Sequence, residues 1–203
     1  MTGSQATFTT SGPYVNLPSG LFGSYAAVSV EAWVTTGVNT MYARVFQFGA
    51  SGTSNANSIL VYRDSTAATF SLQWFTSGSY QSFFVSTVSF DSKANVHLVV
   101  TVSAGDYARL YINGVLLGNT PDVVNPIPPP TTFYIGKSFD GEPGLIGSVN
   151  EFRIWAGVLS ATDITTRYSQ GPGAPSCDFA TLIDSSGMLF LTITAAVTCL
   201  NIS

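Results

Sequence analysis

The ionisable side chains that could perform catalysis are few. The chain contains three glutamates, at positions 31, 142 and 151, and one histidine, His97. Glycoside hydrolysis needs a pair of carboxyl groups at a fixed separation, and no glutamate in a predicted strand has an acid two residues away on the same face. His97 lies in a strongly apolar segment, which favours a packed, hydrogen-bonded histidine over a general base. Glu151, close to Arg153, is expected to make a structural polar contact. The sequence therefore predicts no enzyme.

Asp140 and Glu142 flank a glycine in a glycine-rich loop. Calcium prefers six to eight oxygen ligands, several of them carboxylates. These two side chains, with Asn57 and backbone carbonyls, are a candidate calcium site and a candidate ligand-binding site. The alternative is a solvated acidic turn, because Asp-Gly favours turn geometry by itself.

A second candidate is the aromatic stretch between residues 74 and 84, from which we select Trp74 and Tyr80. Sugars bind proteins by stacking their apolar faces on aromatic rings, while their hydroxyls meet polar side chains. The alternative is that these rings belong to the core, since alternate residues of a hairpin face inward. Trp33 and Trp155 are expected to face inward.

Composition excludes several classes of function. The chain has 203 residues and a net charge of −4, with 45% hydrophobic but only 9% charged residues. No basic patch is available to neutralise phosphates, so nucleic acid is excluded as a partner. No apolar run is long enough for a transmembrane helix, and the first residues show no leader pattern. A neutral surface rich in Ser, Thr and Asn is typical of extracellular or cell-surface proteins.

Cys177 and Cys199 are the two cysteines. In an oxidising compartment they would form a disulfide that stabilises the C-terminal segment by roughly 3 kcal/mol. The alternative is two buried thiols. A zinc site is not expected, because two cysteines and one distant histidine lack zinc-ligand spacing.

Short strands and turns alternate along most of the chain, which predicts an all-β sandwich. Strands are predicted at 27–34, 44–49, 58–62, 69–75 and 96–102. Residues 109–117 form a predicted hairpin with Asn113-Gly114 at its turn, the strongest short hairpin signal. Ser160 and Asp163 resemble a capping box that opens one short helix near 161–169. Residues 1–171 are therefore predicted to be the sandwich and residues 172–203 a β-rich extension.

Four segments carry a resemblance to known families. They are 28–34 (Val-Ser-Val-Glu-Ala-Trp-Val), 110–115 (Leu-Tyr-Ile-Asn-Gly-Val), 133–136 (Phe-Tyr-Ile-Gly) and 147–155, which is followed by 159–164. In this order they resemble the laminin-G-like domains of the concanavalin A-like lectin/glucanase superfamily, including the pentraxins. The resemblance spans about residues 5 to 171. It implies a two-sheet antiparallel jelly roll with one short helix.

The resemblance also implies where a calcium site would lie. The pentraxin ligand positions match Ala56 and Asn57, then Ser138, Asp140 and Glu142; only three of these five keep a suitable oxygen. Glu31 and Val99 occupy the positions of the cysteine pair typical of pentraxins, so the broader laminin-G-like group is the nearer relative. The strand that carries the catalytic acids in glycoside hydrolases of this fold has no counterpart.

Three functions remain open on the sequence. The first is a non-catalytic module that binds a glycan or an extracellular protein. The second is a structural subunit of an extracellular filament or coat, which self-associates through the C-terminal extension by adding a strand to a neighbour. The third is an unusual carbohydrate-active enzyme. The sequence favours the first.

Overall fold

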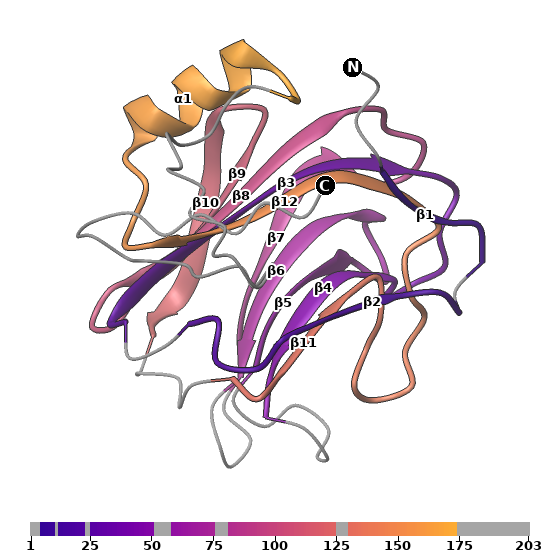
Figure 1. Ribbon diagram of the computed structural model, residues 1–203, viewed down its shortest axis with the longest axis horizontal. Coiled ribbons are helices and arrows are strands. Elements are labelled where there is room, and N and C mark those ends of the chain that lie inside the picture. Colours follow the sequence, from indigo (N-terminus) through magenta and orange to yellow (C-terminus); the bar gives the residue numbers. More distant parts are fainter. Residues whose placement is uncertain are drawn as a thin grey trace, which may run out of the picture.

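The computed structural model describes residues 5–10, 12–22, 25–50, 58–75, 81–124 and 130–173. These residues form two six-stranded antiparallel sheets and one helix (Figure 1). Sheet A consists, in spatial order, of β1 (Ala6–Phe8), β12 (Gly147–Ala156), β3 (Ala27–Thr36), β8 (Val96–Ser103), β9 (Tyr107–Ile112) and β10 (Val115–Val123). Sheet B consists of β2 (Val15–Leu17), β11 (Thr132–Ile135), β4 (Arg44–Gly49), β5 (Ser58–Arg63), β6 (Thr69–Phe75) and β7 (Gln81–Ser89). The predicted jelly-roll sandwich is confirmed.

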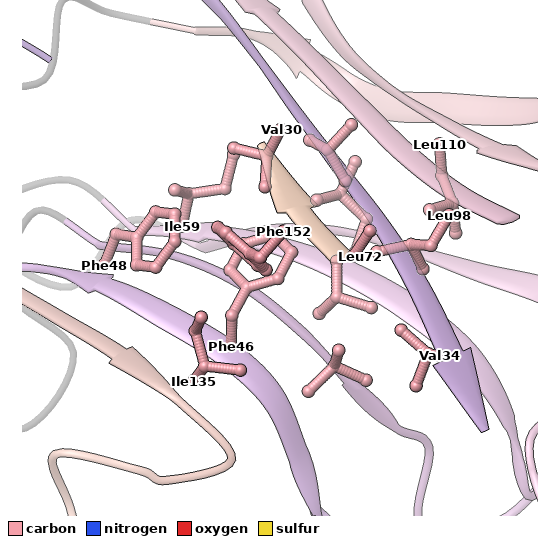
Figure 2. Packing of buried hydrophobic residues seen from close by; sticks show 14 of the residues in the cluster. Val30, Val34, Phe46, Phe48, Ile59, Leu72, Leu98, Leu110, Ile135 and Phe152 are labelled. Atoms are coloured by element: carbon pink, nitrogen blue, oxygen red, sulfur yellow. The ribbon is translucent and has the colours of Figure 1, made fainter. Parts of the chain in front are cut away.

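The main core lies between the two sheets, where alternate residues of each strand meet (Figure 2). Val30 and Val34 of β3 face Phe46 of β4 and Leu72 of β6 within one cluster of buried side chains. This arrangement follows from the period of two along a strand, which sends every second side chain to the same face. The same alternation leaves the other face of each sheet available for different contacts.

The predicted hairpin turn is present between β9 and β10. Asn113 and Gly114 both have positive φ, 50° and 79°, as a two-residue turn of this handedness requires. The Asn113 side chain also accepts a hydrogen bond from the backbone N–H of His97 at 3.0 Å. The turn therefore ties β8 to the hairpin.

The predicted helix is α1 (Ala161–Gln170), and it covers the outer face of sheet A (Figure 1). Its capping box is formed by Ser160 and Asp163, and Gly171 is its C-cap. Ile164 is fully buried against Val99 and Tyr111. None of the described helices is long and apolar enough to cross a membrane.

The expectation for Trp33 and Trp155 is correct in burial but wrong in direction. Both are buried, with 4% and 1% of their surface exposed. Neither belongs to the core between the sheets. Trp33 stacks on Tyr168 of α1, and Arg167 of α1 lies over the Trp155 ring. The helix, rather than sheet B, is what buries them.

Four loops meet at one end of the sandwich, and we call this end the rim. They are residues 37–43, 64–68, 90–95 and 136–146. Backbone hydrogen bonds join them: the Gly37 N–H donates to the Ile146 carbonyl at 2.8 Å, and the Phe90 N–H donates to the Ala68 carbonyl at 2.9 Å. These contacts fix the positions of the loop side chains relative to the sheets.

Candidate functional site

The rim loop, residues 136–146, joins β11 to β12 and carries two of the predicted site residues. It begins at Gly136, whose φ is 78° and whose added Cβ would lie 2.8 Å from the Phe8 ring. Asn39 holds its far end, because its side chain accepts from the Ile146 N–H at 2.6 Å and donates to the Ile146 carbonyl at 3.0 Å. The rim loop is therefore anchored at both ends.

Asp140 is engaged by neighbouring side chains rather than free. Its carboxylate accepts a hydrogen bond from the Ser138 hydroxyl and lies 3.6 Å from the guanidinium of Arg44. Arg44 is only 5% exposed, and it also donates to the Tyr42 carbonyl at 2.9 Å and lies 5.2 Å from the Tyr62 ring centre. Burial lowers the pKa of Arg44 from its ordinary value, and the charges of Asp140 and Glu142 oppose that shift.

An aromatic surface adjoins the rim loop on the outer face of sheet B. Tyr14 is 44% exposed, and its ring lies edge-on to Tyr134 of β11 with 5.1 Å between ring centres. The Lys137 ammonium is 3.8 Å from the centre of the Tyr14 ring and 5.1 Å from that of Tyr134. Phe139 packs edge-on against Tyr134 at 5.2 Å. We call these four residues the platform.

The platform was not predicted as a site from the sequence, although a signal for it is present. Phe133 and Ile135 are core residues, so strand alternation places Tyr134 on the outer face. Tyr14 comes from a segment far away in the sequence, and only the pairing of β2 with β11, which sets Asn16 opposite Tyr134, brings it alongside. Long-range pairing of this kind is not readable from a single sequence.

Trp74, a predicted ligand contact, lies in the core. It is 1% exposed and belongs to the cluster between the sheets, so its ring offers no face to a ligand and that prediction is wrong. Tyr80, Asn57, Cys177 and Cys199 lie outside the described residues, so the tyrosine contact, the third calcium ligand and the disulfide stay predictions.

The described residues alone do not fit a calcium ion. Among them, no group of three or more His, Cys, Asp or Glu side chains could hold a metal. Asp140 is committed to Arg44, and a cation would have to displace that guanidinium. Ser58, which follows Asn57, begins β5 opposite Phe75, whereas the Arg44 partner Tyr62 lies near the other end of the strand. Ser58 and Arg63 are the first and last of the six residues of β5, so roughly 16 Å of strand separates them.

A second ionic cluster lies beneath α1 on the outer face of sheet A. At its centre is Glu31, which is 1% exposed. Its carboxylate accepts from Trp155 Nε1 at 2.9 Å and from Arg153 at 3.4 Å, and it lies 3.0 Å from His97 Nε2. Arg167 of α1 approaches to 3.9 Å. We call these five residues the closed cluster.

The closed cluster keeps its carboxylate charged. Burial raises the pKa of Glu31, but the His97 hydrogen bond and the charges of Arg153, His97 and Arg167 outweigh burial and bring the pKa below its ordinary value. The predicted structural roles of His97 and Glu151 are confirmed, since Glu151 pairs with Arg153 at 2.5 Å and His97 is fully buried. A substrate has no access to Glu31 in this arrangement.

Comparison with solved structures finds the same fold. One match is domain 4 of the extracellular GH43 arabinanase AbnA from Geobacillus stearothermophilus, solved in complex with arabinotriose. It is 21% identical to this chain, the match covers 81% of each of the two chains, and the TM-score is 0.61. A SAP-like heptameric pentraxin from Limulus polyphemus is 16% identical over 98% of this chain and 92% of its own, with a TM-score of 0.60. Trypanosoma rangeli sialidase is 17% identical over 81% of this chain but only 27% of its own, with a TM-score of 0.61.

No curated protein matches the chain by sequence. A family model does match residues 9–165, and its description is the concanavalin A-like lectin/glucanases superfamily, Laminin_G_3. The strand register agrees with the resemblance to pentraxins, because Glu31 lies directly opposite Val99, as the two positions of a cysteine pair would have to. The chain belongs to the concanavalin A-like lectin/glucanase superfamily.

Proposed function

We propose that this chain is a non-catalytic extracellular recognition module that binds a glycan at the platform and the rim loop. The observation that carries the proposal is the exposed ring of Tyr14, set beside Tyr134 and a loop of polar side chains. An exposed aromatic face next to fixed hydrogen-bonding groups suits a sugar, which has apolar C–H faces and polar hydroxyl edges.

Contacts with neighbouring residues hold the platform in position, which favours ligand binding. Tyr134 and Phe139 support the aromatic surface from one side, and the Phe139 N–H donates to the Gln47 side chain of β4 at 3.1 Å. The platform is thus held before a ligand arrives, which reduces the ordering cost of binding. The arabinotriose complex of the AbnA domain supports a glycan as the ligand class, although its low identity establishes the fold alone.

A catalytic role finds less support. Glu31 is buried under α1 and Glu151 pairs with Arg153, which leaves Glu142 as the one glutamate near the platform. Retaining and inverting glycosidases both require two carboxyl groups that flank the same bond. Asp140 is near Glu142 in sequence, but its carboxylate is engaged by Arg44 and Ser138.

The test is a glycan array followed by titration calorimetry with arabinotriose and the best array ligand. We expect Tyr14→Ala to weaken binding at least about tenfold, which corresponds to roughly 1.4 kcal/mol. Tyr107→Ala is the matched control, because Tyr107 is similarly exposed, 38% against 44%, but lies on β9 of sheet A. Equal affinity of the Tyr14→Ala protein and the wild type would contradict the proposed site.

Self-association is the alternative function, and the heptameric pentraxin neighbour is consistent with it. The proposed route runs through residues 172–203, most of which lie outside the described residues. Size measurement of the full chain and of a chain ending at residue 174 distinguishes the two functions. Loss of oligomers with unchanged glycan binding would assign assembly to the extension.

A further inference from the structure

The seven cationic side chains of this protein fall into two groups. All of them lie in the described part of the chain. Each of the five arginines forms an ion pair with an aspartate or glutamate; the pairs are Arg44–Asp140, Arg63–Asp91, Arg109–Asp106, Arg153–Glu151 and Arg167–Glu31. The two lysines, Lys93 and Lys137, pair with no carboxylate among the described residues. Acidic side chains outnumber basic ones in this chain, so most cations can find a carboxylate partner. A lysine at the candidate site without such a partner is therefore unusual.

Lys137 is also positioned by its surroundings. Its ammonium lies between two tyrosine rings, 3.8 Å from the centre of Tyr14 and 5.1 Å from that of Tyr134. The backbone just before it is fixed, since the Gly136 N–H donates to the Val45 carbonyl at 2.8 Å. A ring face attracts the ammonium through its quadrupole but does not use all three N–H donors. Donors are therefore left for a further partner.

The carboxylates of the rim loop do not neutralise Lys137 directly. Asp140 pairs with Arg44, and the charge of Glu142 acts on the same guanidinium. Two acids and two bases thus balance in this region, but Asp140 pairs with the buried cation and neither carboxylate forms an ion pair with Lys137. An anionic group placed against the platform would meet Lys137 as its nearest free cation.

From these contacts we infer that the platform selects a sugar bearing an anionic substituent, either a carboxylate or a sulfate. The sugar ring lies on Tyr14, and its anionic group accepts hydrogen bonds from the Lys137 ammonium. This inference rests on the proposed function and names its ligand class. Because the net charge of −4 repels polyanions in general, the preference arises at this one site rather than from overall attraction.

The experiment uses matched ligands that differ in charge. Tri-galacturonic acid is compared by calorimetry with its carboxyl-reduced, neutral counterpart and with a sulfated galactose trisaccharide. Charge-assisted hydrogen bonds are roughly twice as strong as neutral ones, so we expect the wild type to prefer at least one anionic ligand about tenfold over the neutral one. Raising the salt from 50 to 500 mM should reduce that preference, because the site is exposed and screened by ions.

Three variants separate the charge of Lys137 from its packing. Lys137→Met keeps most of the side-chain stem without charge, and we expect it to lose the anionic preference while affinity for the neutral sugar stays within about twofold. Lys137→Arg should retain the preference, since it keeps both the charge and the attraction to the rings. Lys93→Met, which removes the other unpaired lysine, is the control and should behave as the wild type does.

The possible outcomes separate the two proposals. A preference for either anionic ligand that disappears in Lys137→Met supports the inference and identifies the substituent. Equal binding of charged and neutral sugars by the wild type, or a preference that survives Lys137→Met, overturns the inference while the proposed glycan function stands. If the wild type binds none of the three sugars and no ligand on the array, both proposals fall.

Discussion

The closed cluster and the platform both place a cation over an aromatic ring, the first on the outer face of sheet A and the second on the outer face of sheet B. Arg167 lies 3.8 Å from the Trp155 ring, and Lys137 lies 3.8 Å from the Tyr14 ring. They differ in their access to solvent, because α1 covers the closed cluster whereas Tyr14 is 44% exposed. Each base of the closed cluster also has an acid partner, whereas Lys137 pairs with no carboxylate in the part of the chain that the structure describes. Burial and pairing, rather than residue type, therefore separate a structural ionic cluster from a surface able to bind.

The largest effect that tests this comparison is expected from Glu31→Ala. The change leaves His97, Arg153 and Arg167 without their shared acceptor, and Arg153 is itself only 3% exposed. Removing one partner of a buried ionic group costs about 3–5 kcal/mol. Urea denaturation should show this loss of unfolding free energy. Glu142→Ala, the same change at the rim, is the control and should cost under about 1 kcal/mol; equal costs would contradict the distinction between the two regions.

The pH dependence of stability should follow the same carboxylate. Because the pKa of folded Glu31 lies below its ordinary value of 4.5, its contribution is fully present above that value and is lost as pH falls through the folded pKa. The groups that face Glu31 are His97 of β8, Arg153 and Trp155 of β12 and Arg167 of α1. Glu31→Gln should flatten the acid limb of a stability–pH curve measured by urea titration. An acid limb as steep as that of the wild type would show that other groups cause it.

A smaller effect is expected from Asp140→Ala at the rim. Arg44 would lose its carboxylate but keep the Tyr42 carbonyl and the Tyr62 ring, so the loss should be about 1–2 kcal/mol. Thermal melting measures the stability change, and calorimetry measures the accompanying loss of glycan affinity as the rim loop shifts. Asp140→Asn, which can still accept from Ser138, should lie between the wild type and Asp140→Ala. A loss as large as that of Glu31→Ala would mean that the rim is structurally equivalent to the closed cluster.

The cap of α1 tests how firmly the closed cluster is covered. Ser160→Ala removes the hydroxyl that accepts from the Asp163 N–H at 3.1 Å, and loss of such a cap costs about 1 kcal/mol. Hydrogen exchange should then accelerate in α1 and at Trp155 Nε1, with little change at the rim. Ser169→Ala, near the other end of the same helix, is the control. Uniform acceleration across both sheets would show that α1 does not open independently.

The smallest effect is expected from calcium. The described donors at Asp140 and Glu142 do not make a calcium site, so the melting midpoint should be the same with millimolar calcium and with chelator. A midpoint that rises with calcium would show that residues outside the described part complete a site.

Particular residues show how far the sequence could predict the molecule. Predictions that depend on residues close together in the sequence are confirmed. Asn113-Gly114 forms the turn, Ser160 and Asp163 cap the helix, and the alternating segments are strands. His97 was correctly predicted to be a packed, hydrogen-bonded residue. The predictions for Trp74 and for the direction of Trp33 and Trp155 failed. An aromatic residue in a strand sequence looks the same whether it packs between the sheets, packs under a helix or faces a ligand.

The sequence by itself determined the strand periods, the turn, the helix cap and the membership of the superfamily, because each depends on neighbours within a few residues or on ordered motifs. Only the tertiary structure decided which faces are covered. The placement of α1 over sheet A buried Glu31 and its partners, and the pairing of β2 with β11 brought Tyr14 to Tyr134 and Lys137. These contacts join residues far apart in the sequence, so they form only when the whole chain folds.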